Sequence, residues 1–447
     1  MKQKIALVIG SDFHARSIYS GNLLPSLENE FCLVVIHTSD VKYKDTTSEK
    51  PTREVRLPRF SLAWFPIVLD ANLVRHHRRS RSFHFRIRRR FLGDYKERLP
   101  ISFRGTFGML RAIVTAVPGI YGIVNRIYSY TLSKSKGLVT ILAEEQPDII
   151  LAWAQSSEPT VVSTILAANR LNIPNVIVFD NWDNLSSKGK MVVKPDFVVC
   201  FGKQSQEFAS RIHGLDTNSV LPLGTARFDG YVRKTKQNSS ARETVLIAGS
   251  SISLEDYQVL KLVQKWSTQS KATKSHPNLQ IVYRPHPAPQ GPSLDYKQWE
   301  FSDINIDDTL DHCPSAEVNW PNQDEIIESL YRHKIVIAGP TTLLLEALLS
   351  GCWVIIPALY SKRVRTSTRL MLKKLEHLED IEKVTGVDIA FDERELFSLI
   401  EMRLKERQSP PITDELLYRI NCKDEYFSEK LIRSCRDIIQ HNLESRI

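Results

Sequence analysis

The 447-residue chain lacks the sequence signatures of several protein classes. Its six cysteines are scattered without a CxxC pair, which argues against a structural zinc site or a disulfide framework and indicates a reducing compartment. Neither GSDFHARS (10 to 17) nor GSSISLED (249 to 256) provides the GxGxxG of nicotinamide dehydrogenases. The chain also shows no repeat of fixed period and no low-complexity tract, so a repeat array and a disordered protein are both disfavoured.

An uninterrupted run of about 20 apolar residues, which a membrane-spanning helix needs, is also missing. The most apolar long segment, GTFGMLRAIVTAVPGIYGIV (105 to 124), is interrupted by Arg111 and Pro118. We therefore expect no membrane span. A hydrophobic fraction of 42% and a charged fraction of 25% are instead typical of a globular protein, and the length suits two domains of roughly 200 residues each.

Positive charge is concentrated in one segment. Residues 75 to 98, RHHRRSRSFHFRIRRRFLGDYKER, hold ten Lys/Arg against two acids, or +8 of the net +9. Aromatic and aliphatic residues are interleaved with these cations, which favours docking to an anionic membrane surface. A nucleic-acid surface and a solvated basic helix are the alternatives. The residues expected to dock are Arg86, Arg88, Arg89 and Arg90.

Short β-branched runs alternate with helical patterns, which predicts an α/β fold with parallel sheets. The runs are continuously apolar, so helices should cover both faces of each sheet. The predicted strands are KIALVIG (4 to 10), CLVVIHT (32 to 38), DIILAWA (148 to 154), NVIVFD (175 to 180), DFVVCFG (196 to 202), TVLIAG (244 to 249), LQIVYR (279 to 284), KIVIAG (334 to 339) and WVIIPA (353 to 358).

A polar stretch without periodicity, VRKTKQNSSARE (232 to 243), separates two such series. We predict two doubly wound, Rossmann-type domains facing across a cleft, residues 1 to 231 and 244 to 447, joined by this linker. The first would bind the acceptor and carry a membrane-facing segment at 75 to 128. The second would end in a helical tail. Ligands of such sheets bind at the carboxyl ends of the strands.

Small and hydroxyl residues follow two strands of the second half. Gly249, Ser250 and Ser251 would let backbone N–H groups approach a phosphate at the start of a helix, although an ordinary turn is the alternative. Thr341 and Thr342 stand where another helix begins, and their hydroxyls also favour an anion. The alternative for this pair is a simple N-cap.

An arginine and a histidine stand between prolines in IVYRPHPAP (281 to 289), at the end of another apolar run. Arg284 and His286 on this stiff segment predict an anion site, unless His286 is a packed structural histidine. Glu346 lies about one turn into a leucine-rich helix, where a carboxylate can accept both hydroxyls of a ribose and needs a partner. Together these groups predict one nucleotide-sized site.

Two motifs carry a family resemblance. YRPHP resembles the His-Pro motif of bacterial sialyltransferases, Kdo transferases and CDP-glycerol glycerophosphotransferases. GPTTLLLEALLSGCWVII (339 to 356) is similar to the pattern that follows it in this class, in which a small hydroxyl residue, an acid, Ala and Gly precede an apolar strand. Residues 244 to 358 thus resemble the C-terminal domain of GT-B glycosyltransferases, two-Rossmann-domain enzymes that use nucleotide-activated donors. The N-terminal half resembles them only in architecture.

The resemblance implies roles for the strand-end residues. Arg284 and His286 would hold the donor phosphate, Thr341 and Thr342 would assist, and Glu346 would bind the ribose. Many retaining members carry a glutamate eight residues before the ribose-binding one, and here that position is Ala338, which favours inversion. No DxD stands at a strand end, because Asp303, Asp307 and Asp308 are expected in a loop. A reaction without metal or other cofactor is therefore expected.

The first half should supply the general base. Asp12 or His14, in the loop after the first strand, is one candidate, the alternative being that SDFH caps the next helix. Asp180 and Asp183, in FDNWDNLSSKGK (179 to 190), are rivals, unless they form an Asx-rich turn. Trp182 between them offers a flat face for a sugar ring.

The sequence therefore predicts a glycosyltransferase. It would move a sugar from a nucleotide-sugar donor to a surface polysaccharide or lipid-linked glycan, in the cytoplasm and peripherally on the inner membrane face. The enzyme alternatives are polyol-phosphate transfer from CDP-glycerol or CDP-ribitol and a non-hydrolysing UDP-sugar 2-epimerase. A nucleic-acid-binding protein that uses the basic segment is the alternative from another class, and we consider a nucleic-acid partner unlikely.

Overall fold

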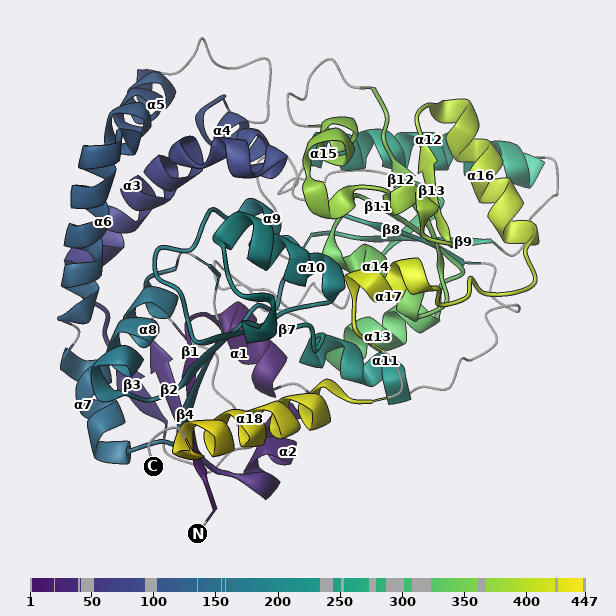
Figure 1. Ribbon diagram of the computed structural model, residues 1–447. Helices are drawn as coiled ribbons and strands as arrows, with labels where there is room; N and C mark the ends of the chain where they lie inside the picture. The colour runs from purple at the N-terminus through teal and green to yellow at the C-terminus, as the bar shows by residue number, and fades with distance from the viewer. Residues whose placement is uncertain are drawn as a thin grey trace.

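The computed structural model describes residues 2–19, 21–38, 41, 52–92, 103–134, 136–153, 155–156, 158–233, 244–250, 253–272, 279–286, 301–307, 323–360, 367–422 and 425–444. These residues form two α/β units, each built on a parallel sheet (Figure 1). The purple-to-teal part of the chain forms most of one unit, and the green part forms the other.

The first sheet has the strand order β3-β2-β1-β4-β5-β6-β7. All its neighbouring strands pair in parallel, as continuous apolar runs predict. Its strands are β1 (Lys4–Ile9), β2 (Cys32–Thr38), β3 (Arg53–Val55), β4 (Ile149–Trp153), β5 (Asn175–Val178), β6 (Phe197–Val199) and β7 (Val220–Leu221).

The second sheet repeats this topology in the order β10-β9-β8-β11-β12-β13, again with parallel pairing. Its strands are β8 (Thr244–Ala248), β9 (Gln280–Arg284), β10 (Ile304–Ile306), β11 (Ile335–Ala338), β12 (Trp353–Pro357) and β13 (Val387–Ala390).

Helices connect the strands and cover the sheets. In the first half they are α1 (Asp12–Tyr19), α2 (Leu23–Glu30), α3 (Arg59–Arg75), η1 (His77–Arg79), α4 (Arg81–Leu92), α5 (Phe103–Ala116), α6 (Pro118–Ser133), α7 (Lys136–Glu145), α8 (Pro159–Leu171), α9 (Asn184–Ser187), α10 (Lys203–Phe208), η2 (Ala209–His213), η3 (Thr217–Ser219), η4 (Ala226–Phe228) and α11 (Asp229–Arg233). In the second half they are α12 (Ser253–Ala272), α13 (Gln323–Tyr331), α14 (Thr342–Leu349), α15 (Thr368–Lys374), η8 (Glu376–Leu378), η9 (Ile381–Lys383), α16 (Glu393–Lys405), α17 (Asp414–Arg419) and α18 (Phe427–Glu444).

Both faces of each sheet are buried, because alternate residues of one strand enter different cores. In β1, Ile5 and Leu7 pack with α1, α2 and α18, whereas Ala6 and Val8 pack with α7 and α8. In β8, Val245 packs with α12 and α16. The predicted doubly wound α/β fold is confirmed, together with each of the predicted strands.

The sequence analysis did not predict four short strands, namely β3, β7, β10 and β13. Of these, β10 changes a functional expectation. Asp307 directly follows it, so this aspartate stands at a strand end and not in a loop. Asp303 precedes the same strand, and Asp308 lies outside the described residues. The strand was missed because its three residues alternate apolar and polar at a sheet edge.

The last helix returns to the first unit. The sequence grouped α18 with the second domain, but in the structure it packs on α2, below the first sheet (Figure 1). Phe427, Leu431 and Cys435 are buried with β1 and β4. The chain therefore crosses between the two units a second time, after α17.

Helices α3, α5 and α6 form an outer layer of the first unit, and α4 lies beside α15 of the second (Figure 1). Phe83, Phe85 and Phe91 of α4 are buried, so these aromatics of the basic segment pack in the protein and do not face a membrane. No single helix of the described residues is long and apolar enough to span a membrane. The helix pair Gly105–Ala116 and Pro118–Ser133, which is bent by 95°, has the length and composition of a span only when its two helices are taken together.

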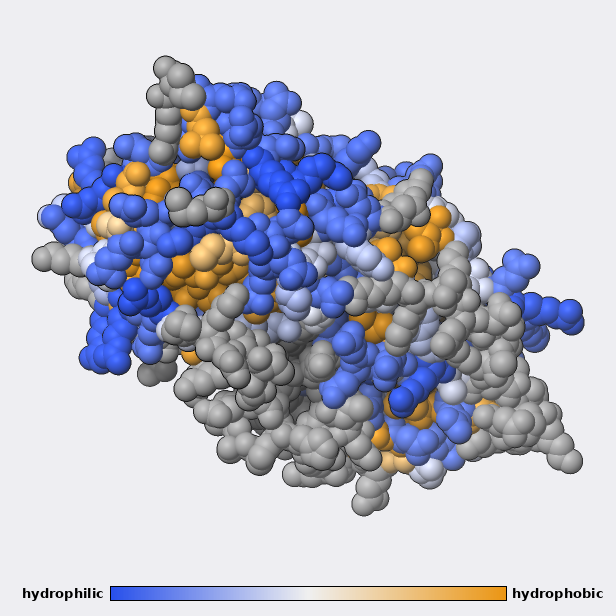
Figure 2. Space-filling view, turned by 90° about the horizontal axis from the view of Figure 1, so that it is seen from below, coloured by the Kyte–Doolittle hydropathy of each residue, from blue (hydrophilic) through white to orange (hydrophobic). Residues whose placement is uncertain are grey.

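Seen from below, the surface is largely hydrophilic, with apolar side chains gathered mainly on the side where α6 and α7 lie (Figure 2). A cavity of about 430 Å³ opens at the amino ends of the first sheet's strands, lined by residues of α7, α8 and α18.

The returning helix should be required for stability. Phe427→Ala removes a ring that is 2% exposed, and we expect it to lower the free energy of unfolding by about 3–5 kcal/mol. Leu443→Ala, near the exposed end of the same helix, should change it by less than about 0.5 kcal/mol. Urea unfolding of the full chain measures both, and equal effects would contradict the packing.

Candidate functional site

The strand order creates a switch point in each sheet. Chain connections lead in opposite directions from β1 and β4, and likewise from β8 and β11. Ligands of doubly wound sheets bind beside such points, at the carboxyl ends of the strands. The residues predicted from sequence to bind a donor follow β8, β9 and β11, which are neighbours in the sheet order β9-β8-β11. The fold thus brings the three predicted segments to one edge.

The segment after β8 approaches the segment after β9 closely. The Gly249 N–H donates to the Arg284 carbonyl at 2.7 Å. A Cβ at Gly249 would lie 2.7 Å from the backbone nitrogen of His286, so only glycine fits here without a backbone shift. Asp256, near the start of α12, accepts from the backbone N–H and the hydroxyl of Ser250, both at 2.9 Å. Ser251 lies outside the described residues.

Two adjacent acids support this edge from α12. Burial raises the pKa of Asp256 to about 7, against the hydrogen bonds from Ser250. Burial likewise raises the pKa of Glu255 to about 7, against its bonds from the hydroxyl and backbone N–H of Thr368. Both carboxyl groups therefore titrate near neutrality, while Asp256 holds the segment after β8 and Glu255 holds the start of α15. Sequence analysis missed them because the start of a helix is a common place for acids.

The predicted phosphate arginine is engaged within the second sheet. Arg284 Nε donates to Asp307 at 2.7 Å, and its Nη2 contacts the Ser329 hydroxyl. These bonds tie the ends of β9 and β10 to α13. His286 follows two residues later and is half-buried. The stiff segment therefore presents His286 at the strand edge while Arg284 braces it.

Thr341 occupies the N-cap position of α14, but its side chain makes no capping hydrogen bond. Thr341 and Thr342 are both half-buried. The two hydroxyls thus lie at the first turn of α14, and hydroxyls at a helix N-terminus are a combination suited to an anion.

Glu346 has the partner that a buried carboxylate requires. Its Oε1 accepts from Arg227 Nη2 at 2.8 Å and from Gln323 Nε2 at 3.3 Å, and both charged side chains are less than a tenth exposed. Arg227 belongs to GTARFD, in the first half of the chain. The expected partner of Glu346 is therefore an arginine of the other unit, and the ion pair joins the two units.

Asp180 extends this network on the side of the first sheet. It follows β5 and is bonded by the Thr225 hydroxyl, and Thr225 also caps η4 by accepting from the Arg227 N–H. Burial alone would lower the pKa of Arg227, but the charges of Glu346 and Asp180 outweigh it and raise the pKa. Arg227 therefore stays charged between two carboxylates.

The other predicted base candidates, Asp12 and His14, lie in the first turn of α1 and not in a loop after β1. His14 Nδ1 lies 2.8 Å from the Ser11 hydroxyl, and burial lowers the pKa of His14 despite the charge of Glu158. Its imidazole is therefore neutral, as a base must be. Asp12 is half-buried in the first turn of α1, and its charge acts on His37 at the end of β2.

His37 is a further candidate that sequence analysis missed. Its Nε2 lies 2.8 Å from the Tyr19 hydroxyl, and burial lowers its pKa against the charge of Asp12. The position at the end of a predicted strand was the only sequence signal for it.

Asp183 and Trp182 have structural roles. Burial would raise the pKa of Asp183, but the charges of Lys188 and Arg86 and the hydrogen bond from the Ser187 hydroxyl outweigh it and hold that pKa far below its usual range. A carboxylate so acidic is poorly suited to general base catalysis. Trp182 is buried, with Nε1 donating to Gln204 at 2.9 Å, so its ring offers no exposed face to a sugar.

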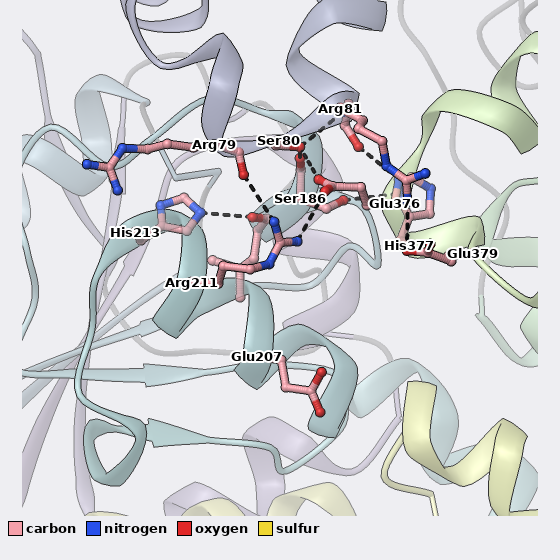
Figure 3. Close-up of polar contacts among 12 residues, drawn as sticks. Arg79, Ser80, Arg81, Ser186, Glu207, Arg211, His213, Glu376, His377 and Glu379 are labelled. Carbon is pink, nitrogen blue, oxygen red and sulfur yellow. Dashed lines mark hydrogen bonds and ion pairs between the residues drawn. The ribbon is translucent and has the colours of Figure 1, made fainter.

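Polar contacts join the two units around Glu376 and His377 (Figure 3). Glu376 of the second unit receives the Ser80 hydroxyl and Arg211 Nη2 of the first, the latter at 3.2 Å. Ser186 Oγ lies 3.0 Å from His377 Nδ1. Burial lowers the pKa of His377 to about 4, against the charge of Asp183, so its ring is neutral in this junction.

The four arginines of α4 predicted to dock to a membrane lie in different surroundings. Arg90 pairs with Asp70 of α3. Arg86 is half-buried near Asp183, and Arg88 is exposed. Arg89 is half-buried. The helix therefore joins the two units of the protein, and only part of its charge faces solvent.

No cluster of three or more His, Cys, Asp or Glu side chains suited to a metal ion occurs among the residues that the structure describes.

The buried pair across the units should be strongly coupled. Arg227→Met and Glu346→Gln should each lower the free energy of unfolding by about 3–5 kcal/mol, because each leaves a buried group without its partner. The double variant should lose less than the sum, by about 0.5–3 kcal/mol. Arg433→Met, which breaks the exposed pair with Glu425, should cost less than about 1 kcal/mol. Additive effects in urea unfolding would contradict the pairing.

The two raised pKa values predict a pH dependence. The folded state binds protons at Glu255 and Asp256 more tightly than the unfolded chain does. The contribution of these two groups to the free energy of unfolding is therefore greatest below about pH 4 and is lost as pH rises through 7. Asp256→Asn should therefore gain stability relative to wild type between pH 5 and pH 8, by up to about 1.4 kcal/mol per unit of raised pKa. Melting temperatures at both pH values measure this, with Glu382→Gln, an exposed acid, as control. A constant difference between variant and wild type would refute the assignment.

Comparison with known proteins shows the fold. No protein-family model matches the chain, and no curated protein matches it by sequence. Among solved structures, the UDP-GlcNAc 2-epimerase of Methanocaldococcus jannaschii is similar with a TM-score of 0.55 and 10% identity over 97% of this chain and 99% of that one. The same enzyme in complex with UDP-GlcNAc and UDP gives a TM-score of 0.51, also at 10% identity with the same coverage. MnaA of S. aureus, solved with UDP, gives 0.50 at 11% identity over 98% and 97% of the chains. The protein has the two-domain, Rossmann-like GT-B fold that the sequence predicted.

Proposed function

We propose that the protein is an enzyme that binds a nucleotide-activated sugar at the carboxyl ends of its two sheets. One observation carries the proposal. The segments after β9, β8 and β11, each predicted separately to bind an anion, lie on adjacent strands at the switch point of the second sheet. The similar structures that were solved with UDP-GlcNAc and UDP, or with UDP, share this fold over nearly their whole length.

The contacts suggest a division of work within this site. His286 and the start of α14, with Thr341 and Thr342, would receive the diphosphate, since both are half-buried at the strand edge. Arg284 would act indirectly by bracing the segment against Asp307. Glu346 would meet the ribose while Arg227 holds its carboxylate in place.

The first unit would act on the sugar. Asp12, His14 and His37 stand at the ends of β1 and β2, and Asp180 follows β5. These groups include neutral histidines and carboxylates, so either proton abstraction from a sugar carbon or deprotonation of an acceptor hydroxyl is chemically available. We assign Asp183 no part in this step, because Lys188 and the Ser187 hydroxyl hold its carboxylate.

Two reactions fit such a site. Epimerisation of a nucleotide sugar is supported by the fold shared with UDP-GlcNAc 2-epimerase. Transfer to an acceptor, of a glycosyl group or of a polyol phosphate, is supported by a different observation, the exposed apolar face of α5 and α6, because a lipid-linked acceptor lies at a membrane. The YRPHP motif, which resembles that of glycosyltransferases, also favours transfer.

Nucleotide binding is tested first. A thermal-shift panel of UDP, UDP-GlcNAc, UMP, CDP, CMP, GDP and ADP should raise the melting temperature for one base by roughly 3 °C at 100 times the dissociation constant. His286→Ala should lose that rise, whereas His441→Ala, on an exposed part of α18, should keep it. If no nucleotide stabilises the wild type, the proposed function fails.

The reaction is tested next, by incubating the protein with the nucleotide sugar that binds and no acceptor. Conversion to an epimer, seen by NMR at the sugar carbons, would establish epimerisation. No conversion without acceptor, but release of nucleotide when membrane lipid extract is added, would establish transfer. Release of CMP alone leaves a polyol-phosphate donor and a CMP-sugar donor, which mass spectrometry of the product distinguishes.

A further inference from the structure

The outer helices α5 and α6 expose a continuous row of large apolar side chains. Phe107, Leu110 and Ile123 are 61%, 58% and 60% exposed. Further large apolar side chains of these two helices are also exposed, and they extend the row across the break between the helices: Met109, Ile113, Val114, Val117, Ile120 and Tyr130. A contiguous patch of this kind marks an interaction surface on a globular protein.

The opposite face of the same helices is packed. Ala112 of α5 is fully buried, and Val124, Tyr128 and Leu132 of α6 are buried in a core with Val68 of α3. Helices α5 and α6 both lie along α3, so the apolar row faces away from the body of the protein. Each helix therefore has two apolar faces, of which one still needs a partner.

The geometry fits a surface contact and not a span. The two helices have 14 and 16 residues, or about 21 and 24 Å, each less than the roughly 30 Å hydrocarbon core of a bilayer. They meet at Pro118 with a bend of 95°, and their inner faces are already packed. Such helices lie in the interface of a membrane, with one face at the boundary between headgroups and acyl chains.

The charged residues of α5 and α6 are all basic, and one of them, Arg111, is paired with the buried Asp70 of α3. Residues 103 to 143 contain five basic residues, at positions 104, 111, 126, 134 and 136, and no Asp or Glu. Arg126 and Lys134 are exposed on α6, and Arg88 is exposed on the neighbouring α4. A second copy of the chain on this face would bring like charges together, because a two-fold interface pairs the same surface patch with itself. Anionic lipid headgroups complement it instead, at about 1 kcal/mol per basic residue.

We propose that the exposed face of α5 and α6 docks the protein on a lipid bilayer with anionic headgroups, the row from Phe107 to Tyr130 entering the headgroup boundary. The contact does not depend on the proposed function. It narrows the membrane-facing segment expected at 75 to 128, with its docking arginines on α4, to the two helices that follow α4. Phe83, Phe85 and Phe91 of α4 pack inward, whereas Phe107 of α5 and Tyr130 of α6 are exposed.

Vesicle flotation with the full chain tests the proposal. The wild type should float with vesicles of phosphatidylcholine containing phosphatidylglycerol, and much less with phosphatidylcholine alone. Leu110→Asp and Ile123→Asp should each weaken binding at least about tenfold. Met402→Asp and Leu443→Asp, at exposed apolar residues elsewhere, should bind as the wild type does.

The contribution of positive charge to vesicle binding is tested with two matched arginine variants. Arg126→Gln should weaken binding to the anionic vesicles about fivefold, whereas Arg407→Gln, an exposed arginine on the far unit, should not change it. Binding of the aspartate variants at wild-type strength would overturn the proposal. So would a concentration-dependent dimer that these variants dissociate, without vesicle binding by the wild type, because a second copy would then cover the face.

The result of the vesicle experiment can be distinguished from the result of the nucleotide-binding experiment. Leu110→Asp and Ile123→Asp alter only exposed residues, so they should keep the wild-type melting temperature and any nucleotide-induced rise. A protein that floats with vesicles but binds no nucleotide would sustain this inference and refute the proposed function.

Discussion

The buried ion pair between Arg227 and Glu346 is the interaction on which the arrangement of the two units depends. A carboxylate on the leucine-rich α14 cannot be buried alone, and its counter-charge comes from the other unit. Thr225 and Asp180 hold Arg227 from the first sheet, and Gln323 holds Glu346 from the second. The pair therefore positions the end of β5 relative to the start of α14, where the candidate site lies.

The junction around this pair combines apolar packing with polar contacts. Phe85, Trp182, Phe201 and Phe228 of the first half share one core with leucines of α14. Beside them, Ser80, Arg211 and Ser186 bond Glu376 and His377. The part of the basic segment that lies here, including Ser80 and Phe85, contacts the second unit. This explains why its charge is divided between internal pairs and solvent, and why the exposed apolar surface appears on the next helices instead.

Particular elements show why sequence predicted some features and missed others. Strands such as β8 and β11 are continuous apolar runs that only a sheet covered on both faces accommodates, so they were recognised. Strand β10 has three residues, and its neighbour Asp307 was therefore assigned to a loop, although it pairs with Arg284. Trp182 was interpreted as an exposed sugar platform because it stands among polar residues. Its ring is in fact buried by residues distant in sequence, which no local pattern reveals.

The sequence by itself determined the α/β class, the division into two parallel sheets and the small, hydroxyl and basic residues at the strand ends, because hydrophobic periodicity and turn chemistry are local properties. Only the tertiary structure decided which charges meet. Glu346 needed a partner, and the partner proved to be Arg227, 119 positions earlier. The return of α18 to the first sheet, the neutral His377 in the junction and the outward apolar face of α5 and α6 were likewise decided by packing between segments far apart in the chain, which the order of residues along it does not reveal.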